Sequence, residues 1–290
     1  GQIAGLVLLD LSAAFDTVNH SILHDVLSDR FGVTGDALLW LSSYLEERSQ
    51  VVKVGESQSS NRKLACGVPQ GSVLGPKQFI AYIGDVTEVF DNHDVSYHGY
   101  ADDMQGLRSC LPAQLATVTD SFKNLITDVH DWCSSRGLQL NPLKTEFIWF
   151  GSSTNLRLIV PEASKIVVDK STTIDSVHVV RDLGVLFDSQ LSMHDHISRV
   201  SRDCFYQLRR LRQVRRHLNR DVMKCLICSF VLSRIDYCNA LLAGLPTASL
   251  RPLQRVQNAA ARLFGGLSKY NHVSPVLRSL HWLPIKQKTH

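Results

Sequence analysis

The sequence contains no long hydrophobic run. No segment reaches the roughly 18 uncharged apolar residues of a membrane-spanning helix, and no secretory signal opens the chain. Hydrophobic residues make up 44% and charged residues 20% of the 290 residues, which excludes a disordered, collagen-like or coiled-coil protein. The chain begins with Gly1 rather than Met, and a strand-like segment follows at once. We therefore expect it to be part of a longer protein.

Cysteine is present but forms no disulfide pattern. The seven cysteines are odd in number and scattered, which indicates a reducing compartment. Cys225 and Cys228 form a single CxxC pair inside an apolar run, without the second CxxC or HxxxH that a zinc site needs. We expect these two cysteines to pack in a core rather than to bind metal.

Acidic residues are scarce in the last hundred positions. Residues 191–290 hold 4 Asp and Glu against 17 Lys and Arg, a net charge of +13, whereas residues 1–190 hold 23 against 14, a net charge of −9. This reversal predicts two units with a boundary near 190. The basic part is suited to nucleic-acid phosphates, although a solvated basic helix surface explains the charge equally well.

Hydrophobic spacing predicts a mixed α+β chain. Strands are expected over residues 3–10, 50–54, 95–100, 104–108, 146–151 and 157–160, and helices over 20–31, 36–47, 79–90 and 111–136. After about residue 190 the pattern becomes helical, with apolar positions three and four residues apart and arginines on the other face.

Three carboxylates follow or separate apolar strands: Asp10, Asp102 and Asp103. If the strands are neighbours in one sheet, these acids converge at one edge, where their repulsion favours binding of a cation. Two Mg²⁺ ions, which prefer hard oxygen ligands, would suit them and could activate a hydroxyl and stabilise a leaving pyrophosphate. Ordinary turn chemistry at Asp102 and Asp103 is the alternative.

Five sequence blocks occur in order: LLDLSAAFDTVNH (8–20), GVPQGSVLGP (67–76), YADD (100–103), LQLNPLKTEFIWF (138–150) and VRDLGVLFDSQLS (180–192). Together they resemble the reverse transcriptase of non-LTR retrotransposons, in particular its jockey-like and vertebrate fish-type branches. The resemblance implies a right-hand polymerase palm over residues 1–190, with an antiparallel sheet and helices packed on one face. It also implies a mostly helical, thumb-like part over residues 191–290. The implied activity is that of an RNA-directed DNA polymerase, a nucleotidyltransferase of a transposable element.

The resemblance assigns roles to the residues of the metal site. It implies two Mg²⁺ ions, for which Mn²⁺ could substitute. Asp10 is implied to bridge both ions and Asp102 to complete the site, with Asp103 as a supporting ligand or a neighbour of the ligands. Lys144 is implied as a general acid for the leaving pyrophosphate, with a solvated lysine as the alternative. Phe15 is implied to lie under the sugar and exclude a 2′-hydroxyl, with a core phenylalanine as the alternative.

The implied substrate contacts come from the other blocks. Gln70, Gly71 and Tyr100 are expected to contact the nucleotide, template or primer end, and Asp182, Leu183 and Gly184 to begin a primer-holding hairpin. Five arginines are expected to follow duplex phosphates: Arg199, Arg202, Arg209, Arg212 and Arg216. The implied partners are an RNA template, a DNA primer or target, and dNTP, with no membrane and no small-molecule cofactor.

Some positions depart from the family pattern. Met104 and Gly106 follow the YADD acids, and Lys77 and Gln78 follow Pro76 where relatives have leucines. The upstream fingers and nuclease regions of the family are absent, so we expect a fragment. A decayed or domesticated nucleic-acid-binding module and an RNA-templated RNA polymerase or intron-maturase relative are the alternatives. An intracellular location, nucleus and cytoplasm, is expected from the family alone.

Overall fold

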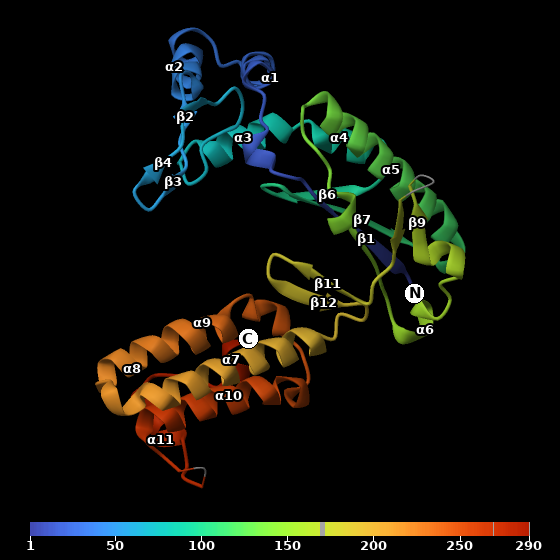
Figure 1. Ribbon diagram of the computed structural model, residues 1–290. Coiled ribbons are helices and arrows are strands. Elements are labelled where there is room, and N and C mark those ends of the chain that lie inside the picture. The colour runs from blue at the N-terminus through green and yellow to red at the C-terminus, as the bar shows by residue number, and fades with distance from the viewer. Residues whose placement is uncertain (169–171, 269, 290) are drawn as a thin grey trace. The chain divides into compact units, whose positions relative to one another are not determined.

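The computed structural model describes residues 1–168, 172–268 and 270–289 and divides into two units, Gly1–His178 and Val179–His290 (Figure 1). The charge reversal near residue 190 assigns the hairpin over 179–188 to the first part of the chain. In the structure this hairpin groups with the helices that follow it, because it packs on the first of those helices.

A four-stranded antiparallel sheet organises the first unit. Its order is β6 (Ser96–Tyr100), β7 (Asp103–Cys110), β1 (Ile3–Asp10), β8 (Glu146–Phe150). The strand β1 lies inside this sheet, paired with β7 on one side and β8 on the other. The predicted strand and hairpin of this region are thus present, and β1 brings Asp10 to one end of the sheet.

Helices cover one face of this sheet, as expected for the predicted palm. The odd-numbered apolar residues Ile3, Val7 and Leu9 of β1 are fully or almost fully buried. Helix α5 (Leu115–Ser135) and helix α4 (Val86–Asp91) pack against β7 and β6 (Figure 1). A Cβ on Gly5 would lie 2.6 Å from the Phe122 ring, so a side chain at this position would push α5 away from the sheet.

Three predicted elements of the first unit are wrong. The strand expected over 50–54 is two separate short strands, β2 (Ser49–Gln50) and β3 (Lys53–Val54), which pair with β5 (Arg62–Lys63) and β4 (Ser57–Gln58). The helix expected over 79–90 is two helices, α3 (Gly75–Ile83) and α4, separated by a turn at Gly84 and Asp85, where Asp85 forms an ion pair with Arg136 at the end of α5. The strand expected over 157–160 is a turn, because Leu158 N donates to Asn155 O and no strand lies beside it in the described residues.

The remaining elements of the first unit are short. They are η1 (Ala14–Asp16), α1 (His20–Asp25), the π-helical turn η2 (Val26–Arg30), α2 (Gly35–Leu45), β2 (Ser49–Gln50), β3 (Lys53–Val54), β4 (Ser57–Gln58), β5 (Arg62–Lys63), η3 (Pro112–Gln114), η4 (Pro142–Lys144), α6 (Ser153–Leu156), η5 (Pro161–Ser164), β9 (Lys165–Val167) and β10 (Thr173–Asp175).

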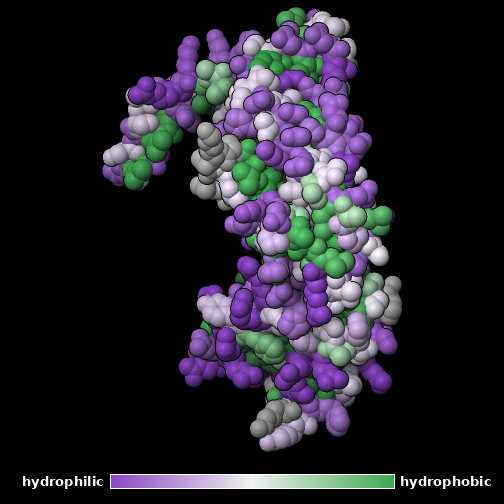
Figure 2. Space-filling view, turned by 90° about the vertical axis from the view of Figure 1, so that its right-hand side faces the viewer, coloured by the Kyte–Doolittle hydropathy of each residue, from purple (hydrophilic) through white to green (hydrophobic). Residues whose placement is uncertain are grey.

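The second unit consists of one hairpin and a group of helices. Its elements are β11 (Val179–Asp182), β12 (Val185–Asp188), α7 (His194–Val214), η6 (Arg215–His217), α8 (Arg220–Ile227), η7 (Cys228–Leu232), α9 (Ser233–Asp236), η8 (Asn239–Leu242), α10 (Thr247–Gly265), α11 (Ser274–Ser279) and α12 (Ile285–Lys288). Helices α7 and α10 pack together, and their apolar stripes form the core of this unit. Hydrophilic side chains cover much of its surface in the space-filling view (Figure 2).

The cysteines are all free in this structure. Burial raises the pKa of the Cys133 thiol to about 12 and that of the Cys204 thiol to about 11. The expectation that Cys225 and Cys228 pack in the core is wrong for Cys225, which is exposed, and Cys228 is half-buried. Among the described helices, none combines the length and the apolar character needed to cross a bilayer.

Candidate active site

A row of polar side chains crosses one end of the four-stranded sheet. Asp10 of β1 is paired with Asp103 of β7, and Asp103 is paired in turn with Tyr100 of β6. Residues directly opposite each other on antiparallel strands point to the same face of a sheet. This face is opposite to the buried one that carries Ile3, Val7 and Leu9, so Asp10 and Asp103 share the more open side of the sheet.

Lys144 extends this row. Its Nζ lies 3.0 Å from Asp10 Oδ2, with the lysine side chain 63% and the aspartate side chain 25% exposed. The chain after α5 runs alongside the end of β1: Ser12 N donates to Gln139 O at 2.8 Å and Asn141 N donates to Asp10 O at 2.9 Å. Backbone hydrogen bonds therefore hold the segment that carries Lys144 against Asp10, although 134 residues separate the two in the sequence.

Asp102 occupies the turn between β6 and β7. Ala101 before it has a φ of 54°, in the left-handed region that a tight turn uses. Asp102 is half-buried and Asp103 is exposed. The structure thus brings all three predicted acids to the same end of the sheet. Asp10 and Asp103 lie on the adjacent strands β1 and β7, and Asp102 lies in the turn just before β7.

The three acids do not form a closed set of ligands. In the described part of the chain, no group of three His, Cys, Asp or Glu side chains is arranged to hold a metal ion. Close carboxylates repel each other without a cation between them, and the ammonium group of Lys144 neutralises Asp10 here. The donor set is nevertheless made of carboxylate oxygens alone, which are the ligands that Mg²⁺ and Mn²⁺ prefer.

The loop over residues 67–76 is attached to the segment that follows β1. Gly67 N donates to Val18 O and Val68 N donates to Phe15 O, each at 2.8 Å. A Cβ on Gly67 would lie 2.9 Å from Asp16 O, so this glycine is required by close backbone packing. Gly71, at a φ of 76°, has open space around the position of a Cβ atom and is exposed.

Phe15 and Gln70 lie where these two segments meet. The half-buried Phe15 ring stacks on Phe79 of α3, with ring centroids 4.6 Å apart and an interplanar angle of 19°. Gln70 is exposed, and its Nε2 donates to Asp16 Oδ1 at 3.2 Å. The stacking fixes the position of the Phe15 ring, and the Gln70 bond connects the loop to the residue next to Phe15.

The predicted primer-holding segment is the turn of the β11–β12 hairpin. Asp182 and Val185 close the turn, and Leu183 and Gly184 between them have φ values of 43° and 89°. Two positive φ values in a two-residue loop define a type I′ turn, which is unusual for leucine. The hydroxyl of Tyr237 donates to Leu183 O at 2.6 Å and so supports this turn.

Sequence reasoning missed two residues that hold this hairpin on α7. The buried carboxylate of Asp188 accepts hydrogen bonds from Gln190 N, Ser192 N, Ser192 Oγ and Met193 N. The buried His196 accepts from Leu186 N through Nδ1 at 3.3 Å, and burial lowers the pKa of its imidazole. An aspartate followed at short spacing by serines is a cap signal that could have identified Asp188.

The five predicted phosphate-binding arginines are all exposed but have different surroundings. Arg199 lies 3.9 Å from Asp203, which also faces Arg234. Arg202 lies about one helical turn from Arg199 on α7, and Arg209 lies about two turns beyond Arg202 on the same side of the helix. Arg216 lies beyond α7 and its Nε donates to His217 Nε2. Arg212 lines a separate cavity with Arg215 and Arg262.

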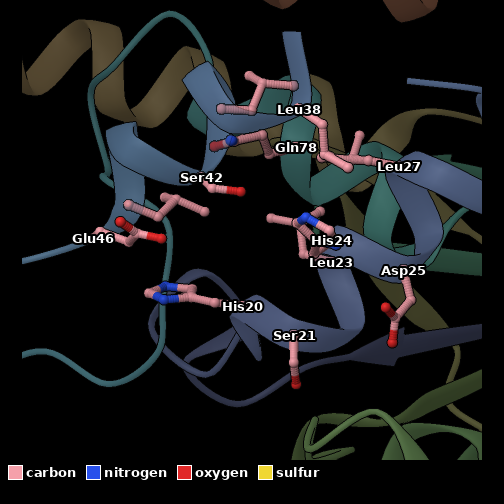
Figure 3. Close-up of a pocket in the computed structure, with 12 residues that line it drawn as sticks. His20, Ser21, Leu23, His24, Asp25, Leu27, Leu38, Ser42, Glu46 and Gln78 are labelled. Carbon is pink, nitrogen blue, oxygen red and sulfur yellow. The ribbon is translucent and has the colours of Figure 1, made fainter. Parts of the chain in front are cut away.

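A second cavity of about 280 Å³ lies in the first unit, away from the row of acids. It is lined by α1, η2, α2 and one residue of α3, Gln78, as Figure 3 shows. Gln78 is 3% exposed, and neither its Nε2 nor its Oε1 has a hydrogen-bond partner among the described residues. None of the sequence-predicted site residues lines this cavity.

The sequence matches the model of one protein family, reverse transcriptase (RNA-dependent DNA polymerase), over residues 1–187. The chain belongs to this family. Similar proteins in Drosophila melanogaster are a probable RNA-directed DNA polymerase from transposon BS, 29% identical over 211 residues, and the RNA-directed DNA polymerase from mobile element jockey, 29% identical over 198 residues. These matches cover 71% and 66% of the chain and identify it as a jockey-like, non-LTR retrotransposon member.

The chain spans about a fifth of the length of these relatives, 22% and 20%. Among solved structures, a Candida albicans telomerase in complex with an RNA fragment aligns with 97% of this chain and 50% of its own, at a TM-score of 0.45 and 11% identity. A Candida tropicalis telomerase aligns with 64% of this chain and 34% of its own at a TM-score of 0.45 and 16% identity. Membership of the reverse transcriptase family implies dependence on a divalent metal ion.

Proposed function

We propose that this chain carries the catalytic centre of an RNA-directed DNA polymerase of a non-LTR retrotransposon. In this proposal it adds nucleotides from dNTP to the 3′-hydroxyl of a DNA primer on an RNA template. The observation that carries the proposal is the pairing of Asp10 with Asp103 across neighbouring strands on the more open face of the sheet. Family membership over residues 1–187 supports it.

Asp10, Asp102 and Asp103 would hold the metal ions, which we propose are Mg²⁺. When bound, such ions activate the primer hydroxyl and neutralise charge on the phosphates. On the protein side, Lys144 would hold a proton within reach of the leaving pyrophosphate. Before the substrates bind, the hydrogen bond to Asp10 would keep the ammonium group of Lys144 at the site.

The neighbouring residues would position the substrates. Phe15, held by its stacking on Phe79, would lie against the sugar and exclude a 2′-hydroxyl. The accessible backbone at Gly71 and the side chains of Gln70 and Tyr100 would contact the nucleotide, template or primer end. The turn over 182–184 would contact the primer backbone.

The test is primer extension on an RNA template with dNTP and Mg²⁺. Because the chain spans about a fifth of its relatives, it is assayed alone and as a replacement for the matching segment of the jockey polymerase. We expect Asp10→Asn and Asp103→Asn to abolish extension in whichever form is active. The matched control is Asp91→Asn, an exposed aspartate at the end of α4, which should leave extension unchanged. Extension that survives Asp103→Asn would overturn the proposal.

A further inference from the structure

Three arginines surround a cavity at the end of α10 in the second unit. The cavity has a volume of about 550 Å³. Arg212 and Arg215 enter it from α7 and η6, and Arg262 enters it from the last turn of α10. The other lining residues carry no charge: Ala259, Leu263, Gly266, Leu267 and Ser268.

The positive charge of this cavity is not balanced by protein carboxylates. Within the described ranges, none of the three guanidinium groups has a carboxylate within 4.0 Å. This differs from Arg199 and Arg234 of the same unit, which share Asp203. Gathering three like charges without an anion is unfavourable, because each charge raises the energy of the others.

The end of helix α10 accounts for part of this arrangement. A helix C-terminus carries about half of a negative charge, which favours a nearby cation. Gly266 ends α10 with a φ of 66°, and a Cβ on it would lie 2.5 Å from Arg215 Nη2, so the glycine admits that guanidinium group to the helix end. The half charge of the helix end compensates only part of one arginine charge. Most of the positive charge of the three arginines therefore stays uncompensated.

Arg262, the arginine from α10, also has a buried hydrogen-bond donor that lacks an acceptor. The Nε atom of Arg262 is buried and has no hydrogen-bond partner among the described residues. A buried donor without an acceptor destabilises the fold, because it has lost its hydrogen bonds to water and gained none in the protein. Arginine forks are well matched to the oxygens of a phosphate group, which accept several hydrogen bonds at once.

We propose that this cavity is a phosphate-binding site, in which the three arginines bind the oxygens and Arg262 Nε donates one of the bonds. The phosphate is either a free one, such as inorganic phosphate, or a phosphodiester of a nucleic-acid strand. This site belongs to the second unit and does not depend on polymerase activity.

The test measures binding to the full chain by titration calorimetry, with inorganic phosphate in one arm and the dinucleotide dTpT in the other. We expect saturable binding that weakens at least tenfold in Arg262→Gln and in Arg212→Gln. Arg212 is exposed, so its variant should fold even if the half-buried Arg262 is needed for folding. The arm with the tighter binding identifies whether the phosphate is free or part of a strand.

The matched control is Arg255→Gln, which removes an exposed arginine from the same helix outside the cavity. We expect this variant to bind as the unchanged chain does, and we expect phosphate to shift the Arg262 Nε–H resonance in NMR spectra. Absence of saturable binding in both arms, or an equal loss in Arg255→Gln, would show general charge attraction and overturn the proposal.

Discussion

Replacing Gln78 with leucine should stabilise the first unit. The amide of Gln78 is 3% exposed, and both of its polar atoms lack partners among the described residues. An unpaired buried amide costs about 1–3 kcal/mol in mutational data. Leucine has a similar volume and no polar group to desolvate. We therefore expect Gln78→Leu to raise the free energy of unfolding of this unit by about 1–3 kcal/mol.

The second unit offers a matched control. Gln257 is fully buried, but its Nε2 donates to Leu283 O at 2.8 Å and its Oε1 accepts from Gln254 Nε2 at 2.9 Å. The same substitution there removes both hydrogen bonds of a buried, satisfied amide. Gln257→Leu should therefore lower the stability of the second unit by about 1–3 kcal/mol.

The assay is urea unfolding, with hydrogen exchange of peptides from each unit to separate their transitions. Opposite signs for Gln78→Leu and Gln257→Leu are the expected result. If Gln78→Leu destabilises the first unit as Gln257→Leu destabilises the second, the amide of Gln78 has a partner and the reasoning is refuted.

Three further predictions concern the two candidate sites. Lys144→Met should lower the rate of nucleotide addition roughly 100-fold, as loss of a general acid does; single-turnover kinetics that show only a change in KM would contradict this role. Tyr237→Phe removes the hydrogen bond to Leu183 O and should destabilise the hairpin turn by about 0.5–1.5 kcal/mol, measured as faster amide exchange at Gly184. Unchanged exchange would show that the turn is stable without this hydrogen bond. Burial lowers the pKa of His196. Its neutral form therefore stabilises the second unit above the unfolded pKa near 6.5, and this contribution is lost as the pH falls below that value. His196→Asn should reduce the loss of stability between pH 7 and pH 5, measured by thermal unfolding.

The sheet and its acidic end could be predicted from the sequence because their signals are local. A few consecutive residues are enough to predict the apolar strand that ends at Asp10 and the two strands around Asp102 and Asp103. The opposition of Asp10 and Asp103 then follows from β1 and β7 being neighbours.

The contacts that the sequence did not predict are tertiary. At the break between α3 and α4, Asp85 pairs with Arg136, which is 51 residues away in the sequence. The support of the hairpin turn by Tyr237 joins residues 54 apart. Helical spacing could not show that Cys225 is exposed, because an apolar run does not indicate which face of the helix packs against other helices.

The position of β1 inside its sheet has a consequence for how the chain folds. This strand precedes both of its partners, β7 and β8, which begin at Asp103 and Glu146. During synthesis its two edges therefore stay unpaired until the segment that ends at Phe150 has left the ribosome. Such long-range pairing slows folding and leaves the nascent strand open to association with other chains. A chaperone that covers this strand until β8 has been made would limit such association.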